Sequence, residues 1–342
     1  MMAEQLQRMT GAGDTVFLTG ASGFVGSHIL RALLAAQYRV RALVRPGSRP
    51  PSPLEGYTAV PGDVLHSGDL VQHMVGCRYL VHAAALYSFS PGMHDRMFAT
   101  NVRGCAGVLE AAHRVGIERA IVTSSSSTVG PSHGGHLATE DDWDVEDDSS
   151  AYHKSKLQQA RIALAARVPV VLILPTAPIG PGDWKPTPTG KMVVDFMRGR
   201  IFATLGGGLN VVAVEDVAQA HVLALQYGRP RERYLVGGEN ISLSQLWERL
   251  AQICGRTAPT VRIPFPLALT FGHADELRCR LFRNGKGGMA APLIPLEGVR
   301  MARHHMYASS AKAQSELGYE ATSVTTALER AVRWYRDNGY VT

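Results

Sequence analysis

The sequence contains no apolar run long enough to span a bilayer, and residues 1–14 lack the apolar core of a signal peptide. It has four cysteines, whose spacing is neither paired nor typical of a metal site. No helix-turn-helix, zinc-finger or base-stacking signature is present. We therefore expect a cytoplasmic protein that has no membrane span, binds no metal and has no nucleic-acid partner.

A glycine-rich turn joins an expected strand to an expected helix. Residues 15–19, Thr-Val-Phe-Leu-Thr, predict a buried parallel strand, and apolar residues recur at helical spacing over 25–34. Glycines occur at every third position between them, and the N-terminus of such a helix offers free N–H groups to a pyrophosphate. A glycine-rich turn without a ligand is the alternative. We assign to dinucleotide binding Gly20, Ser22, Gly23, Phe24, Val25 and Gly26.

The position at which an NAD-specific site carries an acidic residue is not acidic in this sequence. Such sites place Asp or Glu about 20 residues beyond the glycines, on the ribose 2′-OH. Val44 and Arg45 occupy that place here, and no acid occurs between Asp14 and Glu55. A guanidinium suits a 2′-phosphate by its charge and its bidentate geometry. We therefore predict NADP (NADPH) as the cofactor, bound through Arg45; a solvated basic face is the alternative.

A third expected strand is followed by Gly62, Asp63 and Val64. The Asp63 carboxylate can accept a hydrogen bond from an adenine amino group, so we assign Asp63 and Val64 to the cofactor site. An aspartate that only shapes the turn is the alternative.

Tyr152 and Lys156 are four residues apart and share one face of an expected helix. A free tyrosine has a pKa near ~10 and transfers protons poorly at neutral pH. A lysine ammonium and a positively charged nicotinamide ring favour the phenolate, so we expect them to lower the pKa of Tyr152. The expected strand 117–123 runs into four serines, 124–127, and a serine hydroxyl there can bind the substrate oxygen. This pattern predicts hydride transfer, with Lys156 also on the nicotinamide ribose.

With these motifs the chain resembles the extended short-chain dehydrogenase/reductase family from about Thr15 to Tyr340. The narrower resemblance is to the hopanoid-associated sugar epimerase and dihydroflavonol-reductase-like group, carried by residues 185–190 and 296–302. The family resemblance also rests on the segments His82–Ala85, Asn101–Gly104, Leu174–Asp183, Val214–Val217 and Ser310–Tyr319.

The resemblance implies a catalytic triad of Ser125, Tyr152 and Lys156, with Ser124 as the alternative serine because the four-serine run blurs the register. Asn101 would order the site through its helix. Further cofactor contacts implied in this way are Ala83, Ala84, Ala85, Asn101, Thr123, Tyr152, Lys156, Pro175 and Ala177. The substrate contacts that we assign are Tyr87, Ser125, Ser126, Tyr152 and Thr189.

Strand and helix patterns alternate up to residue 174, which predicts an α/β fold with a doubly wound parallel Rossmann sheet. We expect a dinucleotide-binding domain at 15–174, with returning segments near 209–230 and 307–340. A smaller C-terminal substrate-binding lobe is expected at 175–208 and 231–306.

Three further segments carry expectations of their own. The apolar segment Phe265–Phe282 either lines an apolar substrate pocket or forms the core of the lobe. The acidic segment Glu140–Asp148 is expected to be a solvated loop rather than a metal site. Related enzymes often pair through two helices, here Met93–Val115 and Ser150–Val168, so the resemblance implies a homodimer.

The predicted function is that of an NADP-dependent oxidoreductase, which interconverts a hydroxyl and a carbonyl on a small, hydrophobic substrate of terpenoid, steroid-like or aromatic type. The alternative is a nucleotide-sugar epimerase or dehydratase with retained NAD(P), for which the lobe offers cationic residues. A non-catalytic NADP-sensing module is a third interpretation, which the presence of both Tyr152 and Lys156 argues against. The cationic residues are Arg278, Arg280, Arg283 and Lys286.

Overall fold

The computed structural model describes residues 13–48, 55–87, 91–132, 134–144, 150–281 and 296–341. Its seven-stranded sheet has the order β10-β6-β5-β4-β1-β2-β3, and all neighbouring strands are parallel. The order reverses beside β1, which confirms the doubly wound α/β fold. The strands are β1 (Thr15–Thr19), β2 (Arg39–Val44), β3 (Tyr57–Pro61), β4 (Tyr79–His82), β5 (Arg119–Thr123), β6 (Val170–Pro175) and β10 (Arg233–Val236).

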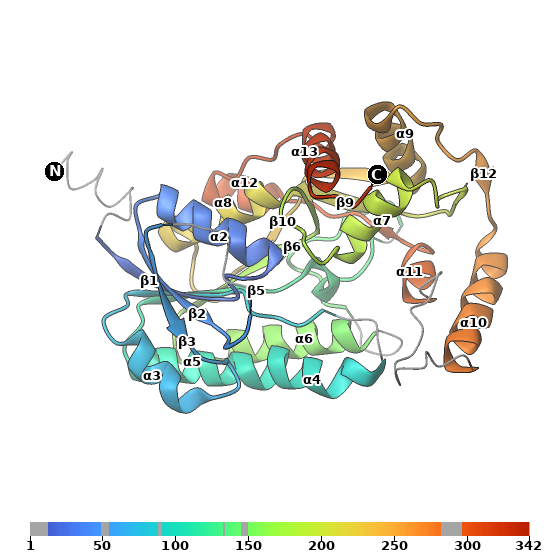
Figure 1. The fold of residues 1–342 in the computed structure, drawn as a ribbon. Coiled ribbons are helices and arrows are strands. Elements are labelled where there is room, and N and C mark those ends of the chain that lie inside the picture. Colours follow the sequence, from blue (N-terminus) through green and yellow to red (C-terminus); the bar gives the residue numbers. More distant parts are fainter. Residues whose placement is uncertain are drawn as a thin grey trace.

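Helices cover both faces of this sheet (Figure 1). Side chains alternate along a strand, so Val16 and Leu18 pack with one helical layer while Phe17 packs with the other. One layer consists of α2 (Phe24–Ala35), α8 (Val214–Tyr227) and α12 (Ala311–Leu317). The opposite layer consists of α3 (Ser67–Met74), η1 (Pro91–Met93), α4 (His94–Phe98), η2 (Ala99–Gly104), α5 (Cys105–Arg114) and α6 (Ala151–Leu164).

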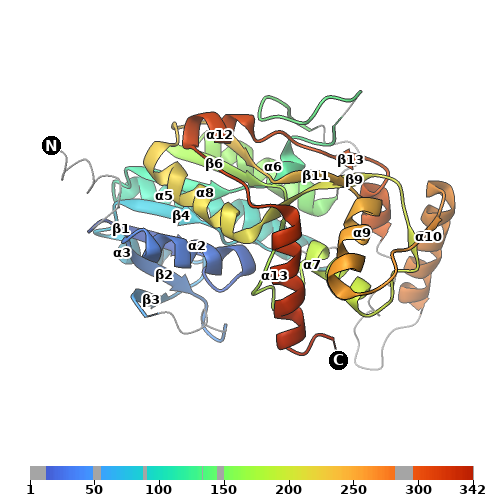
Figure 2. The ribbon, with the colours of Figure 1, turned by 90° about the horizontal axis from the view of Figure 1, so that it is seen from above.

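A second group of elements lies beyond the carboxyl ends of the central strands (Figure 2). Its four-stranded sheet has β9 between β11 and β13, with β7 also paired to β9. The elements are β7 (Ala177–Ile179), α7 (Pro188–Met197), β8 (Ala203–Thr204), β9 (Gly208–Ala213), β11 (Glu239–Ser242), α9 (Leu243–Cys254), β12 (Val261–Arg262), α10 (Phe265–Leu281), α11 (Leu296–Met301), β13 (His305–Met306) and α13 (Val324–Asp337). Apolar side chains of α7, α9 and α13 share one core cluster here.

The sheet order differs from the expected domain boundaries at three elements. β10 lies at the edge of the seven-stranded sheet, although we expected 231–306 in the lobe. β9 belongs to the smaller sheet, and α13 packs in the core of the lobe rather than against the large sheet. The chain therefore crosses between the two groups more often than its composition indicates. The division into two domains stays a proposal.

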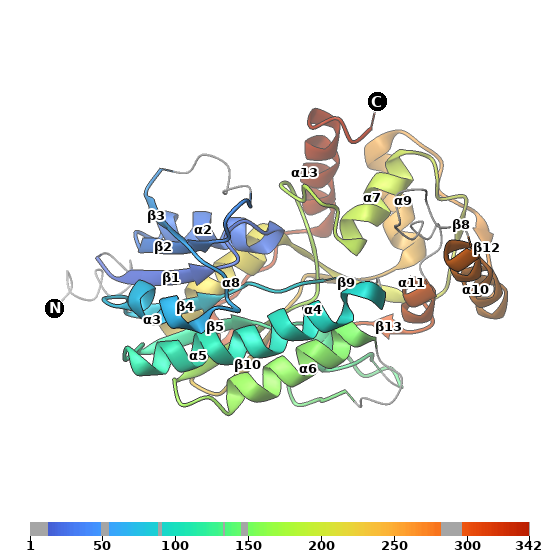
Figure 3. The same ribbon diagram turned by 60° about the horizontal axis from the view of Figure 1, so that its bottom comes forward.

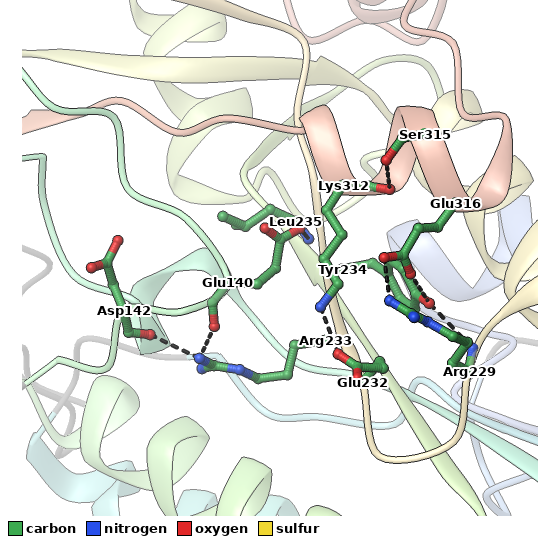
Figure 4. Close-up of polar contacts among 10 residues, drawn as sticks. All are labelled: Glu140, Asp142, Arg229, Glu232, Arg233, Tyr234, Leu235, Lys312, Ser315 and Glu316. Carbon is green, nitrogen blue, oxygen red and sulfur yellow. Dashed lines mark hydrogen bonds and ion pairs between the residues drawn. The ribbon is translucent and has the colours of Figure 1, made fainter.

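Charged side chains surround β10 and join it to a loop and to α12 (Figure 4). Glu140 is buried, and its carboxylate accepts a 2.6 Å hydrogen bond from the Leu235 N–H. The Arg233 guanidinium donates to the Glu140 and Asp142 carbonyl oxygens. Lys312 Nζ lies 2.6 Å from the Glu232 carboxylate. The expectation of a solvated acidic loop is therefore wrong for Glu140, which caps the sheet edge; residues 145–149 lie outside the described part of the chain.

Helix α10 leaves several of its large apolar residues exposed. Ala268 and Cys279 are buried, whereas Leu267, Phe271 and Leu277 are 48%, 52% and 56% exposed. The expectation that this segment forms the core of the lobe therefore fails for these three side chains, and Phe282 lies outside the described residues. Among the helices that the structure describes, none combines the length and apolar character needed to cross a membrane.

A buried carboxylate anchors α13 to the loop before α7. Asp183 is 2% exposed and accepts 2.8 Å hydrogen bonds from the Thr187 N–H and hydroxyl. The Tyr335 hydroxyl, on α13, donates to the same oxygen at 3.0 Å. Burial raises the pKa of Asp183, while these three donors act in the opposite direction. These three hydrogen bonds therefore stabilise the buried negative charge of Asp183.

We expect Tyr335→Phe to lower the free energy of unfolding by about 1–3 kcal/mol, because it removes one donor from a buried carboxylate. Urea unfolding measures this change. Tyr227→Phe is the matched control, since Tyr227 is 46% exposed and should tolerate loss of its hydroxyl. Equal stability of the two variants would contradict the anchoring role of Asp183.

Candidate active site

The turn between β1 and α2 is packed so closely that two positions require glycine. Gly20 has φ +82°, and a Cβ there would lie 2.6 Å from backbone atoms of Ala83 and Ala84. A Cβ on Gly26 would lie 2.0 Å from the Gly20 carbonyl oxygen. The Gly23 N–H donates to that same oxygen at 2.9 Å. The glycines thus form a tight cradle at the carboxyl end of β1.

The N-terminus of α2 opens into this cradle. Gly23 is its N-cap and supplies no side-chain acceptor, and the first turn has no acidic residue. Ser22 and Gly23 are exposed, while Phe24 and Val25 are partly buried. Backbone N–H groups and the positive end of the helix dipole therefore remain available to an anion. These residues fit the pyrophosphate of a nicotinamide dinucleotide.

The next two strands place Arg45 and Asp63 on the same edge of the sheet. Arg45 is exposed directly after β2, and Asp63 follows β3; the register pairs Val44 with Pro61. The Asp63 carboxylate accepts a 3.0 Å hydrogen bond from the Leu65 N–H, as a turn aspartate does. Val64 is buried in the core, so its side chain is turned away from the edge. Adenine contact by Asp63 and Val64 stays a prediction.

Asn101 joins the segment after β4 to helix α6. It is fully buried in η2, a π-helical turn of the kind often found at functional sites. Its Oδ1 accepts from the Leu86 N–H at 2.7 Å, and its Nδ2 donates to the Leu86 carbonyl and the Ser155 hydroxyl, both at 3.0 Å. Ser155 in turn donates to the Tyr152 carbonyl at 2.7 Å. Through these hydrogen bonds Asn101 links the Leu86 backbone to the helical turn that carries Tyr152, in keeping with the ordering role that we expected.

The structure brings Ser125, rather than Ser124, to the tyrosine. The Ser125 side chain lies close enough to the Tyr152 hydroxyl to oppose the rise of its pKa, and the Ser125 hydroxyl accepts hydrogen bonds from the Ser127 N–H and hydroxyl. Ser124 is buried, and its hydroxyl has no partner among the described residues. This geometry favours Ser125 over Ser124 as the serine beside the tyrosine, because η3 (Ser126–Thr128) begins after Ser125 and turns the chain; the catalytic role of Ser125 stays a prediction.

Lys156 lies behind this pair. It is 1% exposed, and its Nζ donates to the Thr123 carbonyl at 2.8 Å and to the Gln159 side-chain oxygen. Burial lowers the pKa of Lys156 to about 8. Burial also raises the pKa of Tyr152 to about 12, against the opposing effect of Ser125. In the protein without cofactor, desolvation therefore dominates, and the expectation that Lys156 and a nicotinamide ring together lower the pKa of Tyr152 stays a prediction.

The residues assigned to the substrate do not all gather at one place. The Tyr87 ring packs edge-on against the Tyr152 ring with centroids 4.2 Å apart, and Tyr87 is 38% exposed. Ser126 is partly buried beside Ser125. Thr189 lies in the first turn of α7, which packs chiefly on α13, α9 and β7. For the cofactor assignments, Ala83 and Ala84 touch the cradle, while Pro175 and Ala177 lie where β6 passes into β7.

Two polar neighbours of the site were missed by the sequence analysis. Gln159 contacts Lys156, and the i, i+3 spacing on one helix could have indicated it. The His221 Nε2 lies 2.8 Å from the Thr123 hydroxyl, across almost a hundred residues of chain. Burial lowers the pKa of His221 to about 4, so it is neutral. No pattern in the sequence marks His221, because its contact depends on how α8 packs on β5.

Comparisons with known proteins agree with this geometry. The profile of the NAD dependent epimerase/dehydratase family matches residues 16–237. A protein of Synechocystis sp., named only provisionally as a dihydroflavonol 4-reductase, is 39% identical over 96% of both chains. Sterol demethylase protein B of Methylococcus capsulatus is 30% identical over 96% of this chain and 100% of its own. The crystal structure of gox2253 superposes with a TM-score of 0.83, at 33% identity over 96% of this chain and 100% of that one.

Gly26→Ala tests the cradle. We expect at least ~10-fold weaker NADPH binding in a calorimetric titration, because the new methyl group collides with the Gly20 carbonyl and opens the turn. Gly68→Ala is the matched control: Gly68 is an exposed residue of α3 with nothing near its Cβ position. The control should bind NADPH as the unchanged protein does. Unaltered affinity in Gly26→Ala would show that the turn does not hold the dinucleotide.

Proposed function

The chain belongs to the NAD-dependent epimerase/dehydratase family, within the extended short-chain dehydrogenases/reductases, and we propose that it is an NADP-dependent oxidoreductase. Its proposed reaction interconverts a hydroxyl and a carbonyl on a small hydrophobic substrate. The observation that carries this proposal is the proximity of the Ser125 and Tyr152 hydroxyls, with the buried Lys156 behind them. A hydroxyl pair of this kind can bind a carbonyl oxygen and transfer one proton to it.

The proton would move through Tyr152. Its pKa of about 12 keeps the hydroxyl protonated, so it can donate to a substrate oxygen as negative charge develops there. Ser125 orients that hydroxyl and offers its own hydrogen-bonding group to the same oxygen. Ser127 holds Ser125 in position through two hydrogen bonds. Bound NADPH supplies the hydride that completes a reduction.

The preference for NADP is supported by Arg45. This exposed guanidinium stands at the carboxyl end of β2, where an NAD-specific site would carry an acid. No acidic residue follows within the strand or the turn at 45–48. A 2′-phosphate placed there would gain a charge-assisted contact, while the ribose 2′-OH of NAD would lack its usual acceptor.

The hydrophobic substrate class is supported by the aromatic ring beside the tyrosine. Tyr87 is partly exposed against Tyr152, so it offers an apolar face to whatever occupies the reaction site. Relatives over the full length bear dihydroflavonol and sterol names. A nucleotide-sugar epimerase or dehydratase that retains NAD(P) is the second candidate, favoured by the family description. Against it, Arg278 is already paired with the Asp275 carboxylate at 2.8 Å.

Hydride transfer from labelled NADPH distinguishes the two candidates. We expect label in the product alcohol and stoichiometric NADPH consumption when hydrophobic carbonyl compounds are supplied. Tyr152→Phe and Ser125→Ala should each lower this rate by about 100-fold or more, since each removes part of the hydroxyl pair. Ser124→Ala is the matched control and should retain the rate. Epimerised nucleotide sugar with no label and no NADPH consumption would favour the second candidate instead.

Cofactor preference forms a separate prediction. NADPH should bind at least ~10-fold more tightly than NADH, which corresponds to about 1.4 kcal/mol. Arg45→Asp should reverse this order by replacing the phosphate contact with an acceptor for the 2′-OH. Arg39→Asp makes the same charge change at the amino end of β2 and should leave the order unchanged. Equal or tighter NADH binding by the unchanged protein, measured by calorimetry, would exclude the assignment.

A further inference from the structure

The buried ammonium of Lys156 has no counter-ion. Its two hydrogen-bond acceptors are uncharged: the Thr123 carbonyl oxygen at 2.8 Å and the Gln159 side-chain oxygen. Within the described parts of the chain, no carboxylate acts on this group. A charge that is removed from water without an opposite partner is costly, so the ammonium depends on the dipoles that surround it.

The other titratable groups around Lys156 are also neutral. Cys105 faces it from α5, and burial raises the pKa of that thiol to about 12. His82 faces it from β4, and burial together with the Lys156 charge lowers the pKa of that imidazole to about 3. On α6 itself, Tyr152 is protonated, and Asn101 approaches the same helix from η2 as a neutral amide. None of these groups supplies a negative charge near neutral pH.

Among the residues that the structure describes, Gln159 is the one side chain whose oxygen bonds directly to the ammonium. It is fully buried on α6, one turn beyond Lys156, where the i, i+3 spacing places the two side chains together. Its Nε2 has no partner among the described residues, and the Cys105 thiol is the polar group that it faces. The amide is therefore held with its oxygen toward the ammonium, because the reverse orientation would set donors against donors.

We propose that Gln159 is a positioning residue, which holds the Lys156 side chain and keeps its ammonium charged where no counter-ion is present. The carbonyl dipole of the Gln159 amide stabilises the positive charge of the Lys156 ammonium. Because the amide itself is neutral, Lys156 can still lose a proton. A carboxylate at this position would lock the ammonium as an ion pair. An apolar side chain would leave the ammonium with the Thr123 carbonyl as its one acceptor.

The effect of Gln159 on cofactor binding rests on the proposed function, in which Lys156 belongs to the catalytic set and binds the cofactor ribose. The positioning of Lys156 by Gln159 does not depend on that function. Because burial lowers the pKa of Lys156 to about 8, the ammonium is present at neutral pH and lost as the pH rises through that value. Cofactor affinity should fall over the same range. Gln159 would thus set the upper limit of the pH range in which the ammonium acts.

The test is a pH titration of the lysine side chains by carbon-13 NMR on the full chain without cofactor. The sequence contains six lysines, so the Lys156 signal can be assigned as the one absent from Lys156→Met. Gln159→Glu should raise the titration midpoint of Lys156 by about 1–3 units, and Gln159→Met should lower it by about one unit. Gln158→Glu adds the same charge to an exposed neighbour on α6 and should shift the midpoint by a few tenths of a unit at most.

Unshifted midpoints in the Gln159 variants, or shifts equal to that of Gln158→Glu, would overturn the proposal. If Gln159→Glu fails to fold, Gln159→Met decides the question, because methionine matches the volume of glutamine without its acceptor. Calorimetric NADPH titrations of the same variants form a separate measurement. Midpoints that shift while NADPH affinity shows no pH dependence would support Gln159 as the residue that holds Lys156, yet contradict the proposed contact of Lys156 with the cofactor.

Discussion

The contact between the glycine turn and the end of β4 organises the candidate site. Gly20 packs its backbone on the peptide between Ala83 and Ala84, at a distance that no other residue permits. From there the chain reaches Leu86, whose backbone is held by Asn101. Asn101 also bonds to α6, which carries the tyrosine. Helix α6 lies alongside α4 and α5 (Figure 3). The same close packing that shapes the glycine cradle therefore determines where Tyr152 lies.

The interior around the site is polar but almost without charge. His82 and His221 are fully buried and neutral, each bonded to a threonine hydroxyl, and the Cys105 thiol is protonated. In such surroundings a charge is stabilised by oriented dipoles rather than by ion pairs. Lys156 is the exception to neutrality: burial lowers its pKa to about 8, and two uncharged oxygens accept hydrogen bonds from its ammonium. A cofactor or substrate that brings charge into this region would alter that balance strongly.

Charged side chains lie instead mostly at the periphery. Their ion pairs and aromatic contacts there join helices, strands and loops. The ion pairs of α12 with Glu232 and Arg229 close the outer edge of the seven-stranded sheet at β10. Arg233 lies over the Trp143 ring at 3.8 Å and ties the preceding acidic loop to the same edge. Asp183 performs a similar task between α7 and α13, although it is buried. These polar contacts therefore close the β10 edge of the seven-stranded sheet and hold α13 to the loop before α7.

The order of strands and helices up to residue 174 and the place of the glycine turn between β1 and α2 were predictable from the sequence, whereas the proposed triad stays a prediction. The order of elements and the place of the turn depend on local periodicity and on short spacings, which one chain segment carries by itself. The sequence could not assign β10 to the large sheet or β9 to the small one, since strand pairing depends on partners far along the chain. Nor could it choose between Ser124 and Ser125, or find Gln159 and His221. Those outcomes depend on which side chains burial brings together and on how much water burial removes from Tyr152 and Lys156, and only the packed structure determines both.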